Sequence, residues 1–179
     1  LISCNIPGIP LNSENLIHRA WDLFRRDFGR LVGGVEIELK KSIPPGAGLG
    51  GGSSNAVGAM VALKHLFDLK IGPGKLEEMA QELGSDCCFF LNGGTAIGSG
   101  RGGELRELRN RLPETWLTIV WPGFSSSTAE AYRRLTASDY RPKEQADRMA
   151  WAIESGNLEA LKKMASNAFY RVVSAGDIR

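Results

Sequence analysis

Five glycines within seven residues constrain this chain more than any other feature. Gly46, Gly48, Gly50, Gly51 and Gly52 directly follow a pair of prolines. Such a stretch cannot continue a helix or a strand for long, because glycine is conformationally free and proline lacks a backbone N–H. Residues 44–52, the glycine-rich loop, are therefore predicted to bend sharply between two regular elements.

The elements on either side of the glycine-rich loop predict what it can bind. Residues 35–39 alternate apolar and acidic side chains, as expected of a half-buried strand. A helix is predicted from Ser53, because Ala56, Met60 and Leu63 share one face. The N-terminus of a helix has unpaired amides and a partial positive charge, and glycines let an anion approach them. The Ser53 and Ser54 hydroxyls can cap the helix or face a phosphate or its magnesium. The sequence thus predicts a phosphate site.

Three alternatives for the glycine-rich loop fit less well. The spacing Gly46-x-Gly48-x-x-Gly51 matches a dinucleotide fingerprint, but the acidic residue at the required distance, Asp68, ends a helix rather than a strand. A Walker loop requires Gly-Lys-Ser/Thr, and this loop contains no lysine. A flexible linker would not be expected to open directly into a capped amphipathic helix.

The rest of the chain is predicted to be mixed in its first part and mostly helical in its second, with a boundary near Pro113. Periodicity predicts helices at residues 15–24, 76–83, 128–135, 142–154 and 158–170, and short strands at 87–91, 95–97, 105–108 and 116–121.

Composition bears on partners and compartment. The formal net charge is +2 without a Lys/Arg block, which argues against nucleic acid as a partner. No apolar run approaches the roughly 20 residues of a membrane span. Cys4, Cys87 and Cys88 do not form a pattern typical of disulfides or zinc, so a reducing compartment is expected. The sequence gives no indication of the oligomeric state.

One carboxylate stands out as a candidate catalytic group. Asp86 follows Gly84-Ser85. It could accept the proton of an attacking hydroxyl, as a general base does in phosphoryl transfer. It could equally close a turn, and the residues alone leave both interpretations open.

The segment from Pro44 to Ala56 resembles the phosphate loop of the GHMP kinases, a family of small-molecule kinases. Three further segments, at residues 14–20, 83–96 and 122–132, are similar to motifs of the same family in the same order. The resemblance implies an α+β fold of two domains with the active site between them, truncated at both ends. It makes residues 1–113 the ATP-binding domain without its first strands, and residues 114–179 the start of the C-terminal domain.

The resemblance also implies roles for individual residues, with ATP and Mg²⁺ as cofactors. Asp86 matches the catalytic aspartate, Asn15 and Lys41 match positions beside adenine and ribose, and Thr128 and Tyr132 match positions near the acceptor. The nucleotide-binding loop would comprise Pro45, Gly46, Ala47, Gly48, Leu49, Gly50, Gly51, Gly52, Ser53, Ser54 and Asn55. Each flanking residue also has a structural alternative: Asn15 or Thr128 as a helix N-cap, Lys41 as a solvated strand end, and Tyr132 as a core aromatic.

The variant Gly-Leu-Gly-Gly-Gly-Ser-Ser-Asn-Ala narrows the resemblance to one branch of the family. That branch phosphorylates the 2-hydroxyl of 4-diphosphocytidyl-2-C-methyl-D-erythritol, in the non-mevalonate route to isoprenoid precursors. The expected compartment is the cytoplasm, or the plastid stroma for a plant gene. Another GHMP kinase and a non-catalytic nucleotide-binding fragment are the alternatives.

Several departures from the family pattern bear on activity. The family's N-terminal lysine strand and terminal third are absent, Cys87-Cys88 replaces a Val-Pro pair, and the segment at residues 99–104 carries an extra glycine. We expect these 179 residues alone to bind ATP weakly and to show little turnover.

Overall fold

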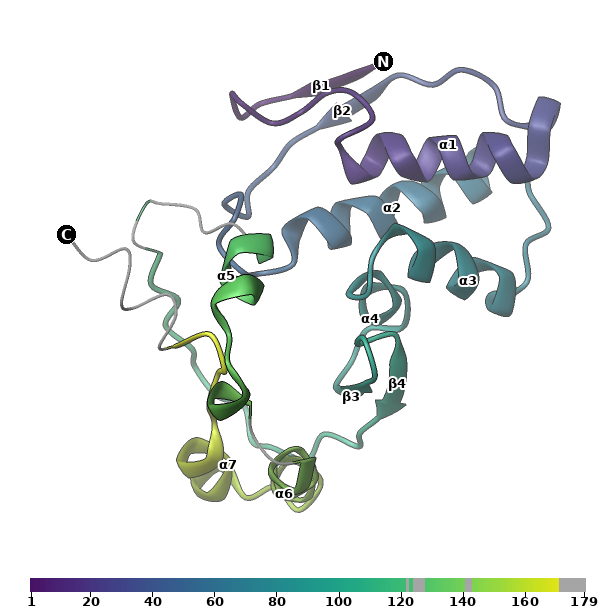
Figure 1. The fold of residues 1–179 in the computed structure, drawn as a ribbon. Helices are drawn as coiled ribbons and strands as arrows, with labels where there is room; N and C mark the ends of the chain where they lie inside the picture. The colour runs from purple at the N-terminus through teal and green to yellow at the C-terminus, as the bar shows by residue number, and fades with distance from the viewer. Residues whose placement is uncertain (122, 124–127, 141–142, 171–179) are drawn as a thin grey trace. The chain divides into compact units, whose positions relative to one another are not determined.

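The structure is a computed structural model that describes residues 1–121, 123, 128–140 and 143–170. It is α+β, and the chain forms two compact units, Leu1–Gly93 with Gly98–Leu105, and Gly94–Ile97 with the residues from Arg106 onward (Figure 1). Its elements in order are β1 Ile2–Cys4, α1 Leu16–Phe28, the 3-10 helix Gly29–Leu31, β2 Ile37–Leu39, α2 Gly51–Leu66, α3 Pro73–Leu83, α4 Cys87–Asn92, β3 Ala96–Ser99, β4 Glu104–Glu107, α5 Thr128–Arg134, the 3-10 helix Ala137–Asp139, α6 Lys143–Glu154 and α7 Leu158–Met164.

The first unit begins with a parallel strand pair. β1 pairs with β2 in the register Ile2 to Ile37 and Cys4 to Leu39, and α1 forms the crossover between them. A crossover is required because parallel strands cannot be joined by a tight turn. The sequence did not predict β1, and β2 is shorter than the strand predicted at residues 35–39. The small sheet is held in place by apolar side chains, since Ile2, Ile17 and Leu39 are buried together.

Four helices enclose the main core of the first unit. α1 lies along α2, and α3 and α4 pack beside them (Figure 1). The predicted helical faces are the ones that are buried: Phe24 from α1, Met60 from α2 and Met79 from α3 are each almost fully inaccessible to solvent. Helices predicted at residues 15–24 and 76–83 are confirmed, and α1 runs four residues further than expected.

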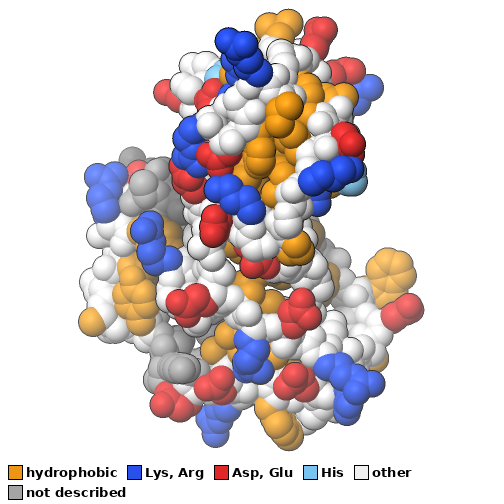
Figure 2. Space-filling model, turned by 90° about the vertical axis from the view of Figure 1, so that its right-hand side faces the viewer, with side chains coloured by type: hydrophobic (Ala, Val, Ile, Leu, Met, Phe, Trp, Pro, Cys, Tyr) orange, Lys and Arg blue, Asp and Glu red, His pale blue; other side chains and the backbone are white. Residues whose placement is uncertain are grey.

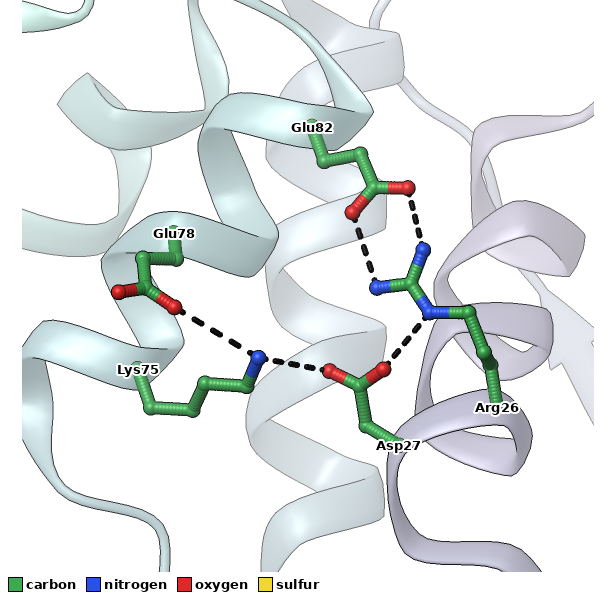
Figure 3. Close-up of polar contacts among 5 residues, drawn as sticks. All are labelled: Arg26, Asp27, Lys75, Glu78 and Glu82. Carbon is green, nitrogen blue, oxygen red and sulfur yellow. Dashed lines mark hydrogen bonds and ion pairs between the residues drawn. The ribbon is translucent and has the colours of Figure 1, made fainter.

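Charged side chains join α1 to α3 at one edge of this core (Figure 3). This α1–α3 charge cluster consists of Arg26, Asp27, Lys75, Glu78 and Glu82. Arg26 donates from Nε to Asp27 Oδ1 at 2.7 Å and from Nη2 to Glu82 Oε2 at 2.9 Å. The ammonium of Lys75 lies 2.9 Å from Asp27 Oδ2. The Arg26 guanidinium and then the Lys75 ammonium hold the pKa of Asp27 below its ordinary value.

Residues 87–91 form a helix, so the predicted strand there was wrong. α4 spans Cys87–Asn92 and ends at Gly93, which has φ 72° and whose amide donates to Phe89 O at 2.7 Å. A short apolar run does not distinguish a strand from a buried helix by periodicity. The helical form lets Cys87 and Cys88 enter the core of the unit.

The second unit buries far fewer large side chains. Its buried apolar residues among those described are Leu108, Ala131, Ala150 and Ala152. The predicted strand at 116–121 was wrong: residues 114–121 pair with no other strand in the described part of the chain, and Trp116 is fully exposed. Apolar periodicity cannot supply the backbone partner that a strand requires. α5, α6 and α7 confirm the predicted helices, although α7 ends at Met164.

Charges of both signs are interspersed on the face drawn in Figure 2, where neither sign forms a continuous field. Within the residues described, no helix has the length and apolarity needed to cross a membrane. The domain boundary near Pro113 stays a prediction.

Candidate nucleotide-binding site

The glycine-rich loop turns by means of left-handed residues. Gly46, Gly48 and Gly50 have φ of 66°, 72° and 66°, a region that favours glycine. α2 then begins at Gly51, two residues earlier than predicted, so the last two glycines of the loop are helical. Left-handed glycines at every second position thus turn the chain into the N-terminus of α2.

The predicted capping role of Ser53 and Ser54 is wrong. The N-cap is Gly50, which has no side chain to cap with, and both serines lie inside the first turn. The first helical hydrogen bond recorded at this end runs from Ser54 N to Gly50 O at 2.9 Å. Because the first amides of a helix have no carbonyl partner within it, the first turn of α2 offers backbone donors to an anion.

The side chains around the glycine-rich loop leave little room for a Cβ at two of its glycines. A Cβ at Gly50 would lie 2.6 Å from Phe90 Cζ, and one at Gly51 would lie 2.9 Å from Ile43 Cγ2. At Gly52 the nearest atom would be Leu16 Cδ1, at an ordinary 3.8 Å. A side chain at Gly50 or Gly51 would therefore displace Phe90 or Ile43, whereas Gly52 has room for a methyl group.

Two of the predicted site residues meet directly. Lys41 Nζ donates to Asn55 Oδ1 at 2.9 Å, which joins the end of the β2 segment to the second turn of α2. The ammonium also lies beside the first residue of α2, since a Cβ at Gly51 would be 3.3 Å from it. Lys41 is half-buried, so the alternative of a solvated strand end does not describe it.

Asn5 holds the backbone of Lys41 and was missed by the sequence analysis. Its Oδ1 accepts from Lys41 N at 2.7 Å, and its Nδ2 donates to Lys41 O at 3.2 Å. These paired contacts fix the segment from which the lysine extends. No local pattern could have indicated them, because the two residues are far apart in sequence.

Asn15 caps α1, as its structural alternative proposed. Its Oδ1 accepts from Ile17 N at 3.0 Å, and its Nδ2 donates to Pro10 O at 2.7 Å. Both polar atoms of the side chain therefore have a structural partner. The residue still lies beside the site, because the neighbouring Leu16 is the side chain nearest to Gly52.

Asp86 is exposed and lies at the start of α4. It occupies the N-cap position of α4, but its side chain makes no capping hydrogen bond. The alternative in which Asp86 serves to cap the helix therefore does not describe it. Burial raises the pKa of the thiol of the next residue, Cys87, and the Ser53 hydroxyl partly opposes that rise. The helix that Asp86 opens packs against α2.

The two acceptor-side residues lie in the second unit, in α5. Tyr132 is 57% exposed, so it is not a core aromatic, and its ring meets that of Phe169 edge-on at 4.9 Å between centroids. Thr128 is the first residue of α5, and its side chain lies outside the described set. Their roles near an acceptor stay predictions.

Comparison with known proteins agrees with this geometry. The family model for the N-terminal domain of GHMP kinases matches residues 15–94, which include the glycine-rich loop, α2 and Asp86. Residues 15–94 are therefore similar to the N-terminal domain of the GHMP kinase family.

Relatives within the family share one name, 4-diphosphocytidyl-2-C-methyl-D-erythritol kinase. The protein of that name from Pelotomaculum thermopropionicum is 42% identical over 93% of this chain and 58% of its own length. The one from Thermotoga maritima is 39% identical over 92% of this chain and 60% of its own length. A crystal structure of 4-(cytidine 5'-diphospho)-2C-methyl-D-erythritol kinase superposes with a TM-score of 0.65 at 33% identity, covering 87% of this chain and 55% of that one. The chain therefore spans about 58–60% of these curated relatives.

Proposed function

We propose that the protein transfers the γ-phosphoryl group of ATP to the 2-hydroxyl of 4-diphosphocytidyl-2-C-methyl-D-erythritol. The observation that carries the proposal is the left-handed glycine series that opens into the first turn of α2 beside Lys41, with Asp86 at the start of the neighbouring helix α4. The shared name of the relatives supports the choice of acceptor.

The glycine-rich loop would hold the triphosphate. The free amides at the start of α2 face an anion without a side chain in the way, and a hydrogen bond to a charged group is stronger than a neutral one. Lys41 and Asn55, paired at 2.9 Å, form one side of this site. We assign them to the adenosine part of the nucleotide, with Asn15 next to them at the N-terminus of α1.

Asp86 would act on the acceptor. An exposed carboxylate without a capping bond is free to accept the proton of the attacking hydroxyl and to orient its oxygen toward the γ-phosphorus. Thr128 and Tyr132, which match positions near the acceptor in the resemblance, are the residues proposed to recognise it. Most of the rate would come from positioning and charge stabilisation.

Magnesium fits this donor set as a companion of the nucleotide. The described residues contain no group of three His, Cys, Asp or Glu side chains that could hold a metal, and Mg²⁺ commonly binds through phosphates with one or two protein oxygens. The Ser53 or Ser54 hydroxyl could supply such an oxygen. When bound, Mg²⁺ neutralises the charge of the phosphates.

A coupled ADP-release assay on the full-length protein tests the proposal. Turnover should require ATP, Mg²⁺ and 4-diphosphocytidyl-2-C-methyl-D-erythritol, and galactose, homoserine and mevalonate should not replace this acceptor. Turnover with one of those three compounds would instead assign another GHMP activity. ADP binding without turnover on any of the four would identify a non-catalytic nucleotide-binding protein.

A further inference from the structure

We propose that Phe90 is a positioning residue that holds the glycine-rich loop in its nucleotide-binding shape through ring contact with Gly50. The inference rests on the proposed function, because it concerns how that loop receives the phosphates. In this proposal α4 both carries Asp86 at its start and supports the glycine-rich loop.

The contact between Phe90 and Gly50 is close. A Cβ built on Gly50 would lie 2.6 Å from Cζ and 2.8 Å from Cε2 of the Phe90 ring, so the ring edge occupies the place of a side chain. Gly50 is also the N-cap of α2, with φ 66°. The ring therefore contacts the residue whose backbone sets the direction of the first turn of α2.

Phe90 is itself well supported. It is half-buried, packs against the main core of the first unit and meets the Phe89 ring edge-on at 5.4 Å between centroids. α4 also packs against α2, whose first amides have no partner within the helix. A rigid wall at Gly50 keeps those amides in place before any ligand arrives.

Preorganisation predicts a specific pattern of effects. Fixing the backbone of one residue is unfavourable in entropy, so without the ring the ligand must order Gly50, and we expect Phe90→Ala to weaken ADP binding roughly tenfold. The KM for ATP should rise while kcat changes little, since binding rather than the transition state is affected. Phe90→Leu should restore most of the affinity.

A matched control separates positioning from core packing. Leu91 lies in the same helix and also packs, partly buried, against the main core. Leu91→Ala should lower the melting temperature as Phe90→Ala does, yet leave ADP affinity unchanged. Equal ADP affinities for the two variants would overturn the proposal.

A double-mutant cycle in the full-length protein tests the contact itself. Gly50→Ala creates both a clash with Phe90 and a strained φ, whereas Gly48→Ala creates strain alone, because no atom lies within 4 Å of its Cβ position. Removal of the ring should relieve the clash, so Gly50→Ala should lower ADP affinity several-fold less in the Phe90→Ala background than in the wild type. Gly48→Ala should have equal effects in both. Additive effects at Gly50 would overturn the inference, whereas a wild-type protein that fails to bind ADP would overturn the proposed function itself.

Discussion

The glycine-rich loop and the α1–α3 charge cluster are two polar regions of the same compact unit, and they are built in opposite ways. In the cluster every charged group faces a partner of opposite sign, from Glu82 through Arg26 and Asp27 to Lys75 (Figure 3). In the loop, apolar side chains lie against Gly50 and Gly52, the Lys41 ammonium lies beside Gly51, and the backbone amides at the start of α2 have no partner within the helix. Satisfied charges stabilise a fold, whereas unsatisfied donors are available to a ligand.

The contrast predicts that substitutions in the two regions will affect different measurements. The largest effect is expected at Asp86. Asp86→Asn in the full-length protein should lower turnover by roughly 10²-fold or more, because the amide cannot take a proton. ADP affinity and melting temperature should stay at wild-type values, since the side chain caps no helix. Steady-state kinetics and calorimetry on the same preparation test this, and near-normal turnover would make Asp86 a structural turn residue.

A methyl group at Gly52 should separate ligand approach from folding. The fold accepts a Cβ there at 3.8 Å from Leu16, so Gly52→Ala should not lower the melting temperature. It should weaken ADP binding roughly tenfold, because displacing a phosphate from a backbone donor forfeits a charge-assisted hydrogen bond. Gly50→Val and Gly51→Val would be poorer tests, since the fold itself already excludes a side chain at both positions.

Gly58 provides the control for that measurement. It lies in the same helix, is exposed, and has no atom within 4 Å of its Cβ position. Gly58→Ala should raise the free energy of unfolding by about 0.5–1 kcal/mol through helix propensity and leave ADP affinity unchanged. Equal ADP affinities for the Gly52→Ala and Gly58→Ala proteins would contradict a phosphate site at the start of α2.

The charge cluster should show the opposite behaviour. Asp27→Asn should lower the free energy of unfolding, because the half-exposed Arg26 guanidinium and Lys75 ammonium lose the carboxylate that joins them. The Asp27 side chain is 13% exposed. Nucleotide affinity should not change. Glu78→Gln is the matched control, since Glu78 is exposed and its contact with Lys75 is 3.6 Å, and it should have little effect on either quantity.

The pH dependence of stability should also distinguish the charge cluster, because its carboxylates stabilise the fold only while they are ionised. The pKa values of Asp27 and Glu82 are lowered in the folded protein, first by the hydrogen bonds from Arg26. Their stabilisation is therefore complete above the unfolded values, near pH 4, and is lost as the pH falls through the lower folded values. Thermal melts from pH 7 to pH 3 should show the gap between wild type and Asp27→Asn closing at low pH. A constant gap would mean that the contribution of Asp27 does not depend on its charge.

The sequence predicted the parts of the molecule that local rules determine. The helices α1 and α3 follow from periodic apolar residues, and the bend before α2 follows from its glycines. The wrong predictions lie where tertiary contacts determine the local structure. α4 has an apolar run too short to show its period, and residues 114–121 have apolar side chains but no backbone partner within the described chain.

The residues that the sequence analysis missed at the site share one cause. Asn5 and Phe90 act on Lys41 and Gly50 through contacts between segments far apart in the chain. Phe90 was part of a recognised motif, but the strand predicted there gave no reason to bring its ring to the glycine-rich loop. Residue type and spacing locate a phosphate site, whereas the side chains that hold it in shape require the packed structure.

Hydrogen exchange of the full-length protein, with and without saturating ADP and Mg²⁺, tests the central claim most directly. If the phosphates bind at the start of α2, the backbone amides of residues 50–54 should be among those most strongly protected by the nucleotide. The amides of α3 around the charge cluster should keep their exchange rates. Protection elsewhere, with residues 50–54 exchanging as before, would contradict the account.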